Sequence, residues 1–136
     1  MVSGPLFVVH KMQARYYTVE EANALLPSLR SVVKELLEAR QRIVDAQPEL
    51  WPTLEKAVGN GGSRKAGAVL ADFEKIQRAV KAIEGLGLQL KDINTRLIDF
   101  LSERDGREVY LCWRFDEPRV AHWHDLDAGF AGRQPL

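Results

Sequence analysis

The chain has 136 residues, of which 46% are hydrophobic and 28% are charged. These proportions are typical of one soluble globular domain and exclude disordered and collagen-like proteins. Nineteen basic residues balance nineteen acidic ones, so the net charge does not favour binding to nucleic acid or to an anionic membrane surface. No apolar run approaches the ~18 residues that a membrane span needs. The single cysteine, Cys112, fits a reducing compartment, and we expect a cytoplasmic protein.

The first helix is predicted from its N-terminal cap. Residues 1–16 have no clear period and are interpreted as an N-terminal arm, and residues 17–136 are expected to form a single α+β domain. Thr18 and Glu21 stand three positions apart, as in a capping box. Because proline lacks an amide donor and crowds the preceding turn, we expect a short segment through about Leu25 and a kink or restart at Pro27.

The helical half of the domain, residues 18–86, is predicted to be a long antiparallel helical hairpin. From Pro27 to about Ala46 the apolar residues form two adjacent helical stripes. These stripes comprise Leu25, Leu29, Val32, Leu36 and Ile43, and Leu26, Val33, Leu37 and Val44. After a connection over residues 48–63, a second stripe predicts a helix over 64–84, closed by Gly85 and Gly87. The wide apolar face predicts a homodimer formed through the helices, in a coiled-coil or four-helix arrangement.

After Gly87 the period of the pattern changes to 2, which is typical of strands. Strands are predicted over residues 88–91, 97–101, 109–113 and 119–124, with Asp105-Gly106 as a type I′ hairpin turn. Residues 88–136 are therefore expected to form a small antiparallel sheet of three or four strands, followed by a tail. The helical hairpin is predicted to pack on this sheet.

The two-residue turn determines which residues lie opposite each other. Arg104 should pair with Arg107, and Asp99 with Cys112. One face then carries residues expected in the core, namely Ile98, Phe100, Val109, Leu111, Trp113 and Phe115. The opposite face carries Leu97, Asp99, Leu101, Tyr110, Cys112 and Arg114. Because this second face is half apolar, we expect something besides water to cover it.

The third strand of this group has two alternative registers, because a one-residue slip exchanges its faces. Burying two unpaired imidazoles costs roughly 1–3 kcal/mol each, whereas burying Trp123 gains a large apolar area. We therefore place Ala121 and Trp123 in the core, with a three-residue loop over Asp116–Pro118. His122 then lies beside Cys112 and His124 beside Tyr110.

This register predicts a row of potential metal ligands, Asp99, Cys112 and His122, with His124 one pleat away. Thiolate, imidazole and carboxylate together suit zinc or iron. Because no motif of fixed spacing accompanies them, a second interpretation stays open. In that interpretation Cys112 packs as a small hydrophobic residue and the histidines are partly solvated.

The C-terminal tail holds a candidate anion site. Gly129, Gly132 and Arg133 have the composition of a backbone nest with an adjacent positive charge. The alternative is a tail that folds back, with Phe130 and Leu136 as apolar anchors and Arg133 paired with Asp125 or Asp127.

Three stretches resemble the uncharacterised prokaryotic family called domain of unknown function 2203. They are YTVEEANALLP at 17–27, DGREVYLCW at 105–113 and HWHDLDAGFAGRQPL at 122–136. The resemblance extends over about residues 16–136. It implies a small, mostly helical cytoplasmic protein, and it transfers no catalytic residue because the family has no assigned activity.

Two hypotheses about function follow, and the sequence does not decide whether the protein is an enzyme. The first is a non-enzymatic, homo-oligomeric interaction or scaffold protein. The alternative is a metal-binding protein, or a metal-dependent enzyme resembling a hydrolase, that uses Asp99, Cys112, His122 and His124 with zinc or iron.

Overall fold

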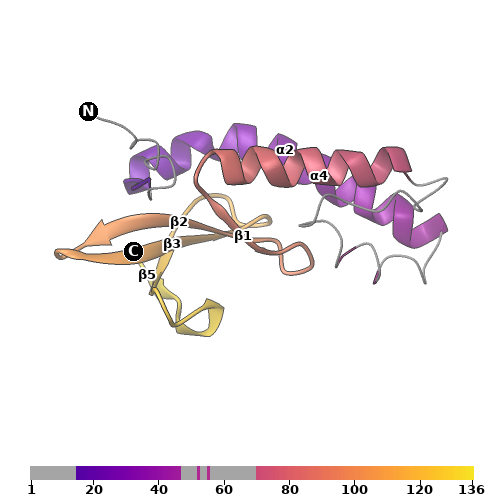
Figure 1. Cartoon of the computed structure of the whole chain (residues 1–136). Coiled ribbons are helices and arrows are strands. Elements are labelled where there is room, and N and C mark those ends of the chain that lie inside the picture. The colour runs from indigo at the N-terminus through magenta and orange to yellow at the C-terminus, as the bar shows by residue number, and fades with distance from the viewer. Residues whose placement is uncertain (1–14, 47–51, 53–54, 56–69) are drawn as a thin grey trace, which may run out of the picture. The chain divides into compact units, whose positions relative to one another are not determined.

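The protein has an α+β fold, as predicted (Figure 1). The computed structural model describes residues 15–46, 52, 55 and 70–136. Most of the predicted arm and connection, and the first residues of the predicted second helix (64–69), lie outside these residues. The elements in chain order are α2 (Val19–Ala46), α4 (Leu70–Gly85), β1 (Gln89–Asp92), β2 (Leu97–Arg104), β3 (Arg107–Arg114), β4 (His122–Asp125), η3 (Phe130–Gly132) and β5 (Gln134–Pro135).

The chain divides into two compact units. One comprises the residues up to Leu26 together with Gly87–Leu136, and the other comprises Pro27–Leu86. Neither of the two helices named above combines the length and the apolar character needed to cross a bilayer.

The predicted capping box begins α2. The Thr18 amide donates to Glu21 Oε1 at 2.9 Å, and the Glu21 amide donates to Thr18 Oγ1 at 3.0 Å. These two bonds satisfy donors that a helix N-terminus otherwise leaves unpaired. The predicted restart at Pro27 is wrong, because α2 continues through the proline to Ala46. A proline within a helix costs about 3 kcal/mol, but buried side chains on both sides of it, Leu26 and Leu29, favour the continuous helix.

The buried residues of α2 come from both predicted stripes. They are Ala22, Leu26, Leu29, Val33, Leu36, Ala39 and Ile43. In α4 the buried residues are Phe73, Ile76, Ala79 and Ile83. Arg42, near the end of α2, forms an ion pair with Asp72 in the first turn of α4 at 2.8 Å. In an antiparallel pair, the C-terminal end of one helix lies beside the N-terminal end of the other, as the ion pair between Arg42 and Asp72 requires.

The sheet has five antiparallel strands in the order β1-β2-β3-β4-β5, so the predicted three or four strands were too few. The extra strand is β5, a two-residue piece of the tail beside β4. The sequence does not predict this strand, because two residues, Gln134 and Pro135, are too few to show the alternation of apolar and polar side chains that is typical of strands. The predicted hairpin register is confirmed, since Arg104 pairs with Arg107 and Asp99 with Cys112.

The hairpin turn and the third-strand register also agree with the prediction. Asp105 and Gly106 have φ angles of 53° and 80°, the positive values that a type I′ turn requires. His122 pairs with Cys112, and Trp123 pairs with Leu111.

The start of the third strand differs from the prediction. β4 begins at His122, three residues later than expected, and the connection before it is longer than three residues. Val120 is buried and Ala121 is only half-buried, contrary to the expected burial of Ala121. The cause is Asn23 of α2, whose Oδ1 accepts the Val120 amide at 2.8 Å, so the chain at 120 follows this contact instead of the strand.

One face of the sheet carries the core of its unit. Its buried residues are Ile98, Phe100, Ser102, Val109, Leu111, Trp113 and Trp123. Tyr17 packs edge-on against Phe100, with ring centroids 5.5 Å apart, and its carbonyl accepts from Ser102 Oγ at 2.6 Å. This arrangement leaves Asp99, Cys112 and His124 on the opposite face.

Candidate metal centre

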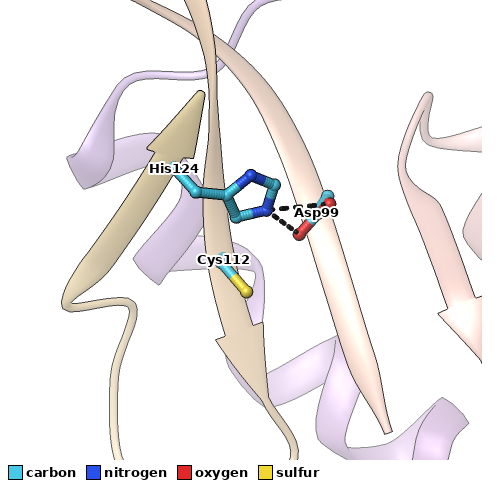
Figure 2. A group of neighbouring side chains, drawn as sticks. All are labelled: Asp99, Cys112 and His124. Carbon is cyan, nitrogen blue, oxygen red and sulfur yellow. Dashed lines mark hydrogen bonds and ion pairs between the residues drawn. The ribbon is translucent and has the colours of Figure 1, made fainter. Parts of the chain in front are cut away.

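Three adjacent strands bring together one carboxylate, one thiol and one imidazole. Asp99 comes from β2, Cys112 from β3 and His124 from β4, and their side chains converge in Figure 2. Their potential ligand atoms all lie within 4.8 Å of one another. Each of the three residues is only 1% exposed. Polar groups buried this deeply need partners, so the contacts of each residue decide what the cluster can do.

His124 has a defined orientation and tautomer. Its Nδ1 lies 2.8 Å from the carbonyl oxygen of Asp125, and because a carbonyl only accepts, Nδ1 carries a hydrogen and donates it. In the neutral ring, Nε2 then presents a lone pair. Nε2 faces the Asp99 carboxylate, 3.3 Å from Oδ1 and 3.2 Å from Oδ2 (Figure 2). Two acceptors at this distance require a proton or a cation between them.

Asp99 is incompletely satisfied by the side chains around it. Its Oδ2 is buried and accepts no hydrogen bond of acceptable geometry. The ammonium of Lys91 approaches Oδ2 to 3.8 Å, which is an ion-pair distance but too long for a hydrogen bond. Lys91 lies where the register between β1 and β2 shifts, between Leu90 and Asp92. Such a bulge redirects a side chain, and here the Lys91 ammonium also lies 5.7 Å from the centre of the Tyr110 ring.

Cys112 is a neutral thiol in this environment. Burial raises its pKa to about 12, and the negative charge of Asp99 acts in the same direction, while Arg133 opposes both. A thiol with this pKa is a poor nucleophile at neutral pH. A metal ion reverses this preference because it binds the thiolate directly.

His122 does not join the cluster, so the predicted row of Asp99, Cys112 and His122 is replaced by a diagonal group containing His124. Arg133 Nη2 lies 3.0 Å from His122 Nδ1, and because a guanidinium only donates, Nδ1 accepts. The hydrogen of the neutral His122 ring is therefore on Nε2. Binding a metal through either nitrogen of His122 requires breaking the bond to Arg133 or changing the tautomer.

The tail residues singled out in the sequence are engaged within the protein. The amide of Gly132 donates to the Gly129 carbonyl at 3.0 Å. Nη2 of Arg133 contacts both carboxylate oxygens of Glu117, at 2.7 and 2.8 Å. The acid that pairs with Arg133 is thus Glu117, whereas the sequence suggested Asp125 or Asp127. The tail folds back, but the expected anchor Phe130 is 44% exposed. Its ring stacks instead against the Arg133 guanidinium, whose Cζ lies 4.8 Å from the centre of the Phe130 ring.

A family model described as "Uncharacterized conserved protein (DUF2203)" matches residues 15–136. The chain belongs to this family. The match confirms the resemblance seen in the sequence and includes every residue of the cluster. No curated protein and no solved structure gives a significant match to the chain.

Sequence reasoning missed two residues that shape this face of the sheet. The sequence pattern predicts Lys91 as an ordinary strand residue, because a bulge produces no signal in the alternation of four residues. Glu117 was assigned to a loop, although it contacts Arg133 and its carbonyl accepts from the Trp113 indole at 2.9 Å. Both contacts depend on how separate segments meet in space.

Proposed function

We propose that this protein binds a divalent transition metal ion, zinc before iron, through Asp99, Cys112 and His124. The proposal is supported by the donor set, since nitrogen, oxygen and sulfur donors together suit zinc. It is also supported by the spacing of one ligand pair. Metal–ligand bonds of about 2.0–2.1 Å in a tetrahedron place neighbouring N and O ligands about 3.3 Å apart, and Nε2 lies 3.2 Å from Asp99 Oδ2.

The observation that carries this proposal is the close approach of His124 Nε2 to the buried Asp99 carboxylate, between which a proton or a metal cation must lie. The second nitrogen of a ligating histidine commonly donates to a backbone carbonyl, which fixes the ring. His124 makes this bond to Asp125. A metal ion bound by Nε2 and Asp99 would take the place of that proton and would also give a partner to the buried Oδ2, which accepts no hydrogen bond. Zinc is favoured because it needs no redox partner and accepts this mixed set.

The test is metal analysis of protein purified without an affinity tag, followed by zinc titration of the metal-free protein. We expect one zinc per chain. Loss of a residue that only orients a ligand costs roughly 10- to 100-fold in affinity, so D99N, C112S and H124Q are each expected to weaken binding by more than this. H122Q is the matched control, because His122 lies on the same strand but outside the cluster. Equal zinc affinity of H124Q and H122Q would contradict the proposal.

A second candidate function, self-association as a homodimeric scaffold, is favoured by the surface of α2. Beside its buried residues, Leu25, Val32, Leu37 and Val44 remain half-buried. Apolar side chains left partly exposed along one helix are typical of a surface that packs against a partner. Light scattering coupled to size-exclusion chromatography should give twice the chain mass, and V32E, but not the neighbouring S31E, should reduce it. A monomer at all concentrations would reject this function.

A further inference from the structure

The cluster supplies three ligands, whereas a tetrahedral zinc ion takes four. Among the described residues, the group of close metal-ligating atoms contains no fourth member. The other imidazole of β4, that of His122, is held by Arg133. A metal with three protein ligands keeps one position for a ligand from solution.

Lys91 determines which kind of ligand suits that position. Its Nζ lies 3.8 Å from Asp99 Oδ2. The formal charges of one divalent ion, one thiolate, one carboxylate and one neutral imidazole sum to zero. The Lys91 ammonium adds one positive charge. An anion in the fourth position restores neutrality and gives the ammonium a hydrogen-bond acceptor.

Lys91 also marks the direction of access from solvent. Its side chain is 43% exposed, whereas that of Asp99 is 1% exposed. Because Asp99, Cys112 and His124 are each only 1% exposed, the space beside them favours a ligand of few atoms.

We infer that Lys91 makes this centre a receptor for a small monovalent anion, which completes the coordination of the metal and pairs with the Lys91 ammonium. This inference rests on the proposed function and adds the class of exogenous ligand. Lys91 acts here as a specificity-determining residue, and it binds no metal itself.

The experiment uses the full chain loaded with Co²⁺, whose visible spectrum reports changes in coordination, and sodium azide as the probe. We expect azide to change the d–d bands of the wild-type protein in a saturable manner. K91M should raise the azide dissociation constant roughly tenfold, as expected for loss of one charge-assisted hydrogen bond. K91R retains the charge and should stay within a few-fold of wild type. K81M, which removes a lysine of α4, should not differ from wild type.

The outcomes separate this inference from the proposed function. Cobalt binding without any azide-dependent change in the spectrum overturns the inference and leaves the metal site standing. Equal azide affinity of wild type and K91M overturns the role of Lys91. Failure of the wild-type chain to bind Co²⁺ or Zn²⁺ overturns both proposals. Circular dichroism of each variant confirms that the loss of azide binding does not come from unfolding.

Discussion

At the scale of residues, the two histidines of β4 show how partners decide what a side chain can do. His122 and His124 are two positions apart, so their side chains leave the strand on the same face. His124 donates from Nδ1 to a carbonyl and presents Nε2 to a carboxylate. His122 accepts at Nδ1 from Arg133. The neutral rings therefore have opposite tautomers, and only His124 offers a lone pair to the cluster.

The Cys112 thiol provides a prediction at the same scale. Its pKa of about 12 lowers the thiolate fraction at pH 8 by about a thousandfold relative to an ordinary cysteine, and its burial blocks access. The metal-free native protein should therefore react with a disulfide reagent at least a thousandfold more slowly than the denatured chain. Absorbance at the released thiolate band measures both rates. Native and denatured rates within tenfold of each other would show that Cys112 is accessible.

At the scale of elements, the start of α2 depends on one side chain. Thr18 Oγ1 accepts the Glu21 amide, and replacing a capping threonine by alanine typically costs about 1 kcal/mol. T18A should lower the free energy of unfolding in urea by about this amount. S31A is the control, because Ser31 is an exposed residue within the same helix and alanine has the higher helix propensity. A loss in S31A as large as in T18A would argue against the cap.

The hairpin turn between β2 and β3 gives a second prediction for an element. Gly106 has φ +80°, and a Cβ placed there meets no atom within 4 Å. The cost of G106A should therefore come from the left-handed backbone alone, about 1–2 kcal/mol. G85A is the matched control, since a Cβ at Gly85 is equally uncrowded and that residue does not have a positive φ. Urea denaturation should show destabilisation of G106A and little change, or a gain, in G85A.

At the scale of the whole molecule, metal binding should couple to stability. Asp99, Cys112 and His124 lie on three different strands, so an ion that they share cross-links the sheet. A ligand at about 100 times its dissociation constant stabilises the native state by about 2.7 kcal/mol. Zinc should therefore raise the melting temperature of the wild-type protein, and a chelator should reverse the increase.

The matched pair for this measurement is D99N and D127N. Asp127 is exposed and lies outside the cluster, so D127N should respond to zinc as the wild type does. D99N should show no increase in melting temperature, because it lacks a ligand. A zinc-dependent increase of the same size in D99N would place the bound ion elsewhere in the molecule.

The elements and their pairing were open to prediction because each depends on neighbouring residues. The capping box at Thr18 and the Asp105-Gly106 turn are local signals, and they led to the helix start and to the pairing of Asp99 with Cys112. The burial of Trp123 then decided the register that pairs Cys112 with His122. Position by position, the sequence was sufficient to name the side chains that β2, β3 and β4 place on the second face of the sheet.

Only the tertiary structure decided which of those side chains meet. Asp99 contacts His124 and not His122, because Arg133 and Glu117, from the tail and a loop, hold His122 away. A bulge in β1 brings Lys91 to the same carboxylate, and Asn23 of α2 changes the path of the chain at Val120. Such contacts join segments far apart in the chain, and their formation depends on distances and angles that no local pattern of residues encodes.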